Sequence, residues 1–178
     1  LPLAWIGEQM MCLSSALLTG FTVNFPEKPE TVQENIREIG PTIMFSPPRI
    51  WENMTSTVQV KVMDASALKR RMYNWALPVG YAYADAVFRK EAISASLRFR
   101  HRVAYALVFR ALKDRLGLLR IRSASTGGAA LGPDVFKFFN AMGVNLKQIY
   151  GQTEISGISC IHREGAINFD SVGKPIPE

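Results

Sequence analysis

Two short segments of this chain carry residues suited to binding a nucleotide and its metal ion. In the first, Thr153 and Glu154 follow Gly151, just after a strand predicted over residues 145–150. A hydroxyl can reach a phosphate, and Mg²⁺ is usually held by one or two carboxylates together with substrate phosphates. The simpler alternative is a helix start, with Thr153 as N-cap and Glu154 in the first turn.

The second segment is Gly127-Gly128, in a turn predicted over residues 125–131 after a strand over residues 118–123. Without side chains, these glycines let a flat base or an acyl carbonyl approach the backbone, and N–H groups exposed in the turn can bind an anion. Taken alone, the pair also fits a plain tight turn. Ligands of open α/β sheets bind beyond the carboxyl ends of the strands, so the two segments together predict one shared site.

The elements that must position these segments form a βαβ unit. Between the two strands, Pro133 at a helix start and Gly143 at a helix end indicate a helix over residues 135–142. Upstream, helices and strands alternate in the same way: a helix over 7–19, a strand over 21–23, a helix over 30–39 and a strand over 42–45. This alternation predicts an α/β fold, with a mainly parallel sheet flanked by helices. Downstream, we expect a strand over 158–161 and a loop over 173–177.

Residues 52–116 interrupt the alternation. Their richness in Ala, Leu and Arg predicts helices over 65–76 and 81–116, divided at Pro78. Alternating valines over 58–62 would also fit a short strand, although helix is favoured. We therefore expect part of one domain with three portions: an α/β portion over 1–51, a basic helical insertion over about 52–116, and an α/β portion over 117–178 that holds the two segments.

The charge of the chain is uneven. Residues 61–122 hold 14 Lys/Arg against 4 Asp/Glu, a balance of +10, and the remainder holds 7 basic and 11 acidic residues, a balance of −4. Three interpretations of this block stay open: a solvated helical surface, contact with an anionic membrane, or binding of nucleic acid. Nucleic acid is the least favoured, because no recognition motif accompanies the charge.

Composition and length limit which other classes of protein the chain could belong to. A chain of 178 residues with 48% apolar and 20% charged residues is typical of one globular domain. No cation precedes Lys28 and Glu8 interrupts the first apolar stretch, so neither a signal peptide nor a membrane span is expected there. Cys12 and Cys160 lie far apart, which fits buried thiols in a reducing cytoplasm. The two histidines lack clustered partners for a metal.

The two segments resemble signature motifs of the adenylate-forming enzymes. Tyr150-Gly151-Gln152-Thr153-Glu154 is similar to their Tyr-Gly-x-Thr-Glu motif, and residues 126–131 to their Gly-Gly-Ala-Pro-Leu turn, with Ala130 where proline is common. Further matches, in the same order along the chain, are to the long-chain fatty acid–CoA ligases: Leu1-Pro2-Leu3-Ala4, Asn24-Phe25-Pro26-Glu27, Pro48-Arg49-Ile50-Trp51-Glu52 and Ser171-Val172-Gly173-Lys174-Pro175.

The resemblance implies a two-step reaction. A fatty acid carboxylate attacks the α-phosphate of ATP with Mg²⁺, giving acyl-AMP and pyrophosphate, and the thiol of coenzyme A then displaces AMP. The resemblance also implies roles for residues: Glu154 ligates Mg²⁺ and Thr153 contacts the α-phosphate, so both are candidate catalytic residues. The expected nucleotide-site residues, which border adenine and the acyl carbonyl, are Gly127, Gly128, Ala129, Tyr150, Gly151, Gln152 and Thr153.

The sequence also departs from the family pattern. The family's phosphate loop would precede Leu1, and its ribose-binding Asp and lysine-bearing C-terminal domain would follow Glu178, so we expect an internal piece of the large N-terminal domain, inactive alone. Trp5 stands where many relatives carry His. Two other functions stay open: an adenylating ligase for an aryl or bile-type acid, and a non-catalytic basic helical module that binds lipid or nucleic acid. The expected location is the cytoplasm, with membrane association through the basic insertion.

Overall fold

The computed structural model describes residues 6–155, 157–163, 165, 167–168 and 171–176. The expected Leu1-Pro2-Leu3-Ala4 match and Trp5 lie outside these residues. The helical elements are α1 (Ile6–Glu8), η1 (Gln9–Ser14), α2 (Ser15–Thr19), η2 (Pro29–Thr31), α3 (Val32–Ile39), α4 (Pro48–Met63), α5 (Ala67–Phe88), α6 (Ala95–Ala104), η3 (Tyr105–Phe109), α7 (Arg110–Arg115), α8 (Pro133–Ala141) and η4 (Thr153–Ile155). The strands are β1 (Ile43–Ser46), β2 (Ser123–Thr126), β3 (Leu146–Gln152), β4 (Gly157–Ile161) and β5 (Lys174–Pro175).

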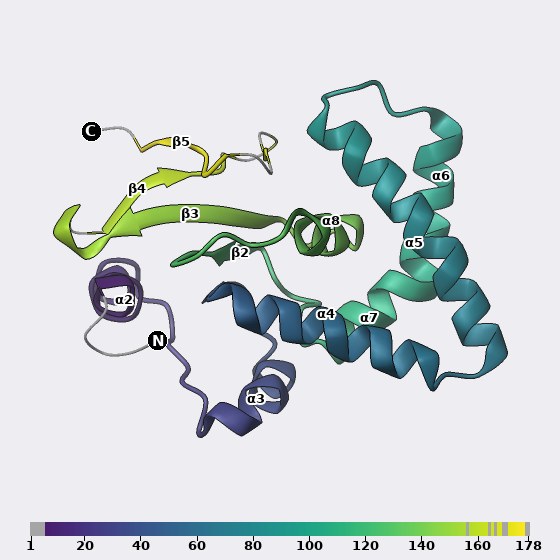
Figure 1. Ribbon diagram of the computed structural model, residues 1–178. Coiled ribbons are helices and arrows are strands. Elements are labelled where there is room, and N and C mark those ends of the chain that lie inside the picture. The colour runs from purple at the N-terminus through teal and green to yellow at the C-terminus, as the bar shows by residue number, and fades with distance from the viewer. Residues whose placement is uncertain (1–5, 156, 164, 166, 169–170, 177–178) are drawn as a thin grey trace.

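The strands form one sheet in the order β1-β2-β3-β4-β5, with helices around it (Figure 1). β1, β2 and β3 are parallel, whereas β3, β4 and β5 are antiparallel. The expected α/β class is confirmed, and the sheet is mixed. Parallel neighbours need a long crossover, and here α4 to α7 connect β1 to β2 while α8 connects β2 to β3.

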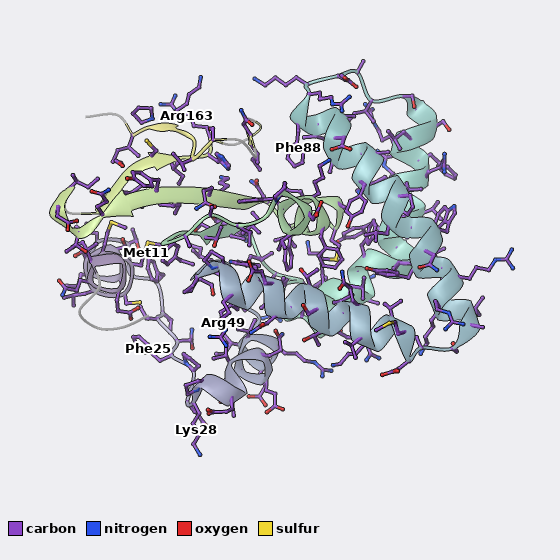
Figure 2. The ribbon with its side chains drawn as sticks, viewed as in Figure 1. Met11, Phe25, Lys28, Arg49, Phe88 and Arg163 are labelled. Carbon is purple, nitrogen blue, oxygen red and sulfur yellow. The ribbon has the colours of Figure 1, made fainter. Side chains whose placement is uncertain are left out.

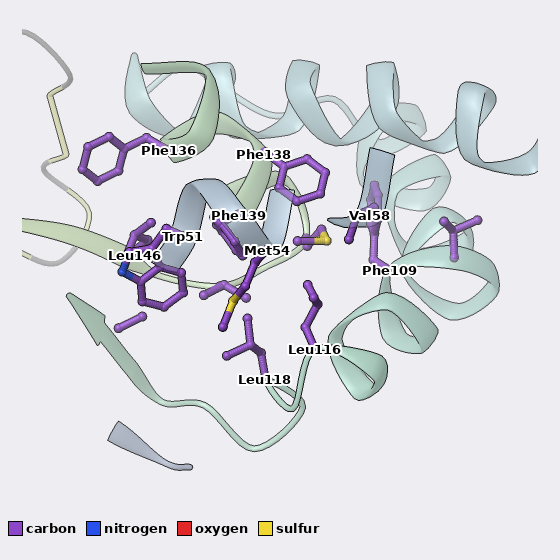
Figure 3. Close-up of a cluster of buried hydrophobic side chains, with 14 of the residues drawn as sticks. Trp51, Met54, Val58, Phe109, Leu116, Leu118, Phe136, Phe138, Phe139 and Leu146 are labelled. Atoms are coloured by element: carbon purple, nitrogen blue, oxygen red, sulfur yellow. The ribbon is translucent and has the colours of Figure 1, made fainter. Parts of the chain in front are cut away.

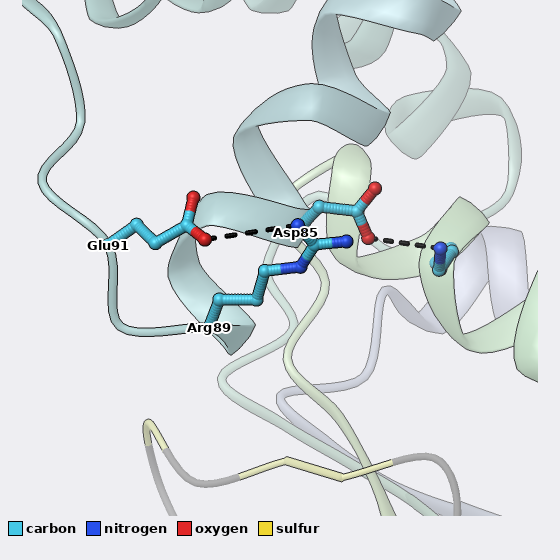
Figure 4. A network of polar contacts seen from close by, with 4 residues as sticks. Asp85, Arg89 and Glu91 are labelled. Carbon is cyan, nitrogen blue, oxygen red and sulfur yellow. Dashed lines mark ion pairs between the residues drawn. The ribbon is translucent and has the colours of Figure 1, made fainter.

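The core lies where α4, α5, α7 and α8 pack around the start of β3 (Figure 3). Trp51 of α4 is fully buried and meets Phe139 of α8 edge to face, with ring centroids 4.9 Å apart. Such aromatic pairs add about 1 kcal/mol beyond their buried area. An ion pair of 3.0 Å between Lys137 and Asp85 joins α8 to α5 (Figure 4).

The predicted helical character of this region is confirmed, but the break lies over residues 89–94, between α5 and α6, and not at Pro78. α5 is one helix over Ala67–Phe88. The reason is tertiary packing at the next turn: a Cβ on Gly80 would lie 2.7 Å from the Phe109 ring and 2.9 Å from the Ala141 Cβ. This close contact with η3 and α8 stabilises a helix that proline alone would interrupt. Within the part of the chain that the structure describes, no helix is long and apolar enough to cross a membrane.

Two strand predictions were also wrong. Residues 21–23 form no strand and Phe21 is 39% exposed, because no neighbouring strand pairs with them. The strand expected over 118–123 begins only at Ser123 and runs to Thr126. Leu118 instead lies in the core, fully buried ahead of the strand. Part of the expected loop over 173–177 pairs with β4 as β5, which local composition does not signal.

Candidate active site at the carboxyl edge of the sheet

The register of the parallel strands places the Gly127-Gly128 turn beside the middle of β3. Thr126, the last residue of β2, aligns with Ser46 at the end of β1 and with Gln148 on β3. Because these strands run in the same direction, the turn after Thr126 and the second half of β3 lie at one edge of the sheet. This edge is where the sequence predicts a shared site.

Gly127 and Gly128 are glycines for different reasons. A Cβ on Gly127 would meet the Ile149 carbonyl oxygen at 3.0 Å and the Phe45 ring at 3.3 Å, so the turn packs directly against β1 and β3. Gly128 has φ +86° with open space around it, and it is exposed. A left-handed backbone favours glycine, and the open space lets a ligand approach the main chain.

Gln148 fixes this turn to β3. Its Nε2 donates to the Ala129 carbonyl oxygen at 3.1 Å and to the Ile149 carbonyl oxygen at 3.3 Å. The side chain is buried, and its Oε1 has no hydrogen-bond partner among the residues that the structure describes. Gln148 is thus a site-supporting residue that the sequence did not indicate, since Ala129 is 19 residues away in the chain.

Beyond Gln148, β3 continues past the end of β2 and carries Tyr150, Gly151 and Gln152 in antiparallel pairing with β4. Gln152 Nε2 donates to the Tyr150 hydroxyl at 2.7 Å, which holds these two exposed side chains together. Gly151 lies against the Gly157 carbonyl on β4, where any Cβ would collide with that oxygen. The pairing shifts register between Tyr150 and Gly151, a local irregularity of the kind found beside active sites.

Thr153 and Glu154 lie in the short turn η4 at the end of β3, and both are exposed. Thr153 lies five positions after Gln148, which corresponds to about 16 Å along an extended strand. The structure describes no cluster of three His, Cys, Asp or Glu side chains that could hold a metal.

His162 supports β3 from the antiparallel side. It is buried; its Nδ1 accepts from the Gln148 N–H at 3.2 Å and its Nε2 lies 2.8 Å from the Ser171 carbonyl oxygen. A carbonyl only accepts, so this geometry corresponds to a neutral ring with its proton on Nε2. The His162 N–H also donates to the Gln148 carbonyl oxygen. No local signal marks His162 in the sequence, because its partners lie 14 and 9 residues away.

Comparisons with known proteins identify the family to which the chain is similar. The model of the AMP-binding enzyme family matches residues 1–178. Curated relatives include long-chain-fatty-acid–CoA ligases of Xenopus laevis (30% identical, covering 99% of this chain and 24% of the relative), Rattus norvegicus (30%, 98% and 26%) and Mycobacterium bovis (29%, 99% and 29%). The chain thus spans about a quarter of the length of the relatives it matches. No solved structure matches it.

Proposed function

The chain belongs to the AMP-binding enzyme family, and we propose that it is part of an ATP-dependent fatty acid–CoA ligase. Such an enzyme is an acid–thiol ligase that joins a fatty acid to coenzyme A through acyl-AMP. The relatives' names support the substrate class. The observation that carries the proposal is the hydrogen bond from Gln148 Nε2 to the Ala129 carbonyl, because it joins the glycine turn to the strand that leads to Glu154.

In this proposal, residues 117–178 contribute the nucleotide side of the active site. Gly127, Gly128 and Ala129 offer open backbone to adenine and the acyl carbonyl. The Tyr150 ring, steadied by Gln152, stacks near adenine, while Gly151 keeps β3 tight against β4. These residues orient the nucleotide so that its α-phosphate lies toward the end of β3. The helical portion over residues 52–116 and the portion over residues 1–51 belong to the same domain.

Thr153 and Glu154 are the proposed catalytic residues. The Thr153 hydroxyl donates to the α-phosphate, where negative charge builds up during attack by the fatty acid carboxylate. Glu154 fits a hard divalent cation, since it is an exposed carboxylate without a competing cation partner among the described residues. Mg²⁺ held there would neutralise and orient the phosphates of ATP.

The test uses the full-length protein and compares Glu154→Gln with Glu38→Gln, the same change at an exposed position on α3. We expect Glu154→Gln to lower fatty-acid-dependent release of pyrophosphate about a hundredfold, the usual scale for losing one transition-state contact. It should also reduce the thermal protection given by ATP with Mg²⁺. Glu38→Gln should change neither. Equal protection in both variants would remove Glu154 from the metal role, and no pyrophosphate release with any fatty acid would remove the ligase proposal.

An adenylating ligase for another carboxylic acid is the second candidate, because the residues on the nucleotide side of the site do not distinguish one acyl group from another. A panel of long-chain, aryl and bile-type acids, each assayed for pyrophosphate release by the unaltered full-length protein, separates the two. Preference for the long-chain acids supports the proposal. Preference for an aryl or bile-type acid would transfer it to the second candidate.

A further inference from the structure

A pocket of about 490 Å³ lies among the helices, between α4, α5, η3 and α7. Pockets of about 300–1,000 Å³ are the usual size for small-molecule sites. In Figure 1 these helices lie at the opposite end of the molecule from the β3–β4 turn that carries Thr153 and Glu154. The pocket is therefore separate from the candidate active site, and the proposed reaction gives it no role.

The floor of the pocket is apolar and continuous with the core. Val58 of α4, Tyr73 of α5 and Val108 of η3 line it and are buried, together with Leu116 just after α7. Leu107, on the η3 side, lines the same pocket and is 55% exposed. An exposed leucine that continues a buried apolar floor offers surface on which an alkyl chain gains by leaving water.

The mouth of the pocket is cationic. Lys61 near the end of α4, Lys69 early in α5 and Arg115 at the end of α7 line it and are exposed, whereas Asp64 is its one lining carboxylate among the described residues. None of the three cations forms an ion pair within the described part of the chain. The side chains at the mouth therefore carry a balance of +2.

We propose that this pocket binds an amphipathic anion, a long alkyl chain that ends in a carboxylate or a phosphate. The apolar floor takes the alkyl chain, and Lys61, Lys69 and Arg115 take the headgroup. Flexible lysines bind such a group as point charges and Arg115 can hold it with two parallel hydrogen bonds. This inference goes beyond the proposed function, since it places an anionic lipid at a second site far from the sheet edge.

The test uses the full-length protein and a long-chain fatty acid that carries a terminal diazirine. After irradiation, labelled peptides are mapped by mass spectrometry, so the readout does not depend on ligase activity. We expect adducts within residues 57–73 and 107–116. An unlabelled fatty acid or alkyl phosphate of equal length should compete, and the one that competes better identifies the headgroup. The alcohol of equal length should compete less, because it lacks the charge.

Ala111 allows a steric test, because it lines the pocket from α7 and is itself exposed. Ala111→Trp fills the pocket and should lower labelling of these peptides about tenfold, whereas Arg110→Gln, on the same helix outside the pocket, should leave it unchanged. Should Ala111→Trp fail to fold, the double variant Lys61→Gln/Lys69→Gln keeps the test open. It should lower labelling about two- to fivefold for each exposed cation removed.

Three outcomes would overturn the proposal. The first is labelling confined to peptides of β2, β3 and η4, which would assign the lipid to the sheet edge. The second is equal labelling of residues 57–73 and 107–116 in the unaltered protein and the Ala111→Trp variant. The third is the absence of adducts in these residues, the result expected if another part of the full-length protein covers the pocket.

Discussion

At the scale of single residues, Gln148 connects the two segments that the sequence singles out. Its Nε2 donates to the Ala129 carbonyl, while its buried Oε1 has no partner within the described residues. An unpartnered buried acceptor costs about 1–3 kcal/mol, which offsets the contribution of about 1 kcal/mol from each of the two hydrogen bonds that Nε2 donates. Gln148 therefore adds little net stability, and its contribution is the position of the turn.

Replacing Gln148 with leucine tests this positioning role. We expect the midpoint of thermal unfolding of the full-length protein to change by only a few degrees, because the two terms offset each other. The KM for ATP should rise several-fold, because the turn over Gly127 and Gly128 is no longer tied to β3. Gln33→Leu is the matched control, since it removes a similar bond, from Nε2 to the Leu116 carbonyl, far from the edge. Equal KM changes in both variants would contradict the role.

Gly151 gives a second prediction at this scale. Gly151→Ala places a methyl group against the Gly157 carbonyl, so β3 and β4 must move apart. We expect the free energy of unfolding to fall by about 1–3 kcal/mol, the usual cost of overpacking. Gly132→Ala is the control, because a Cβ there has open space. Denaturant titration measures both, and an unchanged Gly151→Ala midpoint would show that the two strands are not packed this closely.

At the scale of elements, α5 shows what the sequence could and could not predict. Its helical character was predictable from residue propensity. Its continuity through Pro78 was not, because the contact of Gly80 with the Phe109 ring joins residues 29 apart in the chain. The prediction of a strand over 21–23 was wrong because residues with high β-propensity form a strand only where a partner strand is present. The position of the two motif segments at one edge was predictable, because the carboxyl ends of parallel strands share an edge. Gln148 and His162 depend on long-range partners and were not predictable.

The same helix makes the stability of the protein sensitive to alkaline pH. Burial, and then the neighbouring Tyr81, raise the pKa of Tyr73 to about 12 from an ordinary value of 10. The unfolded chain therefore loses this proton first, so the stability is fully present below about pH 10 and falls as pH rises toward 12. We expect Tyr73→Phe to remove about 2 kcal/mol of that fall. Denaturant titrations between pH 9 and 12 measure it, and parallel profiles for both proteins would contradict it.

At the scale of the whole molecule, the N-terminal segment exposes several large apolar side chains to solvent. Leu17 and Leu18 of α2 are 78% and 86% exposed. Phe25, on the loop before η2, is 62% exposed (Figure 2). Apolar side chains gathered in this way mark an interface or a site of aggregation. We therefore expect this segment to take part in self-association of the chain.

The expected result is that the isolated 178-residue chain associates with itself as its concentration rises. Leu17→Ser/Leu18→Ser should shift it toward the monomer, measured by light scattering coupled to size-exclusion chromatography. Leu68→Ser, at an exposed leucine of α5, is the control and should leave the association unchanged. A monomeric unaltered chain at all concentrations would contradict this prediction.

β3 has a consequence for any attempt to divide the molecule. Its first half pairs with β2 and its second half with β4, so one strand closes both the parallel and the antiparallel parts of the sheet. A cut in the turn after β2 would leave each fragment with an unpaired strand edge, β2 in one fragment and β3 in the other. The two fragments should recombine through the pairing of β2 with β3. Recombination would return the glycine turn and the Thr153 end of β3 to the same edge of the sheet.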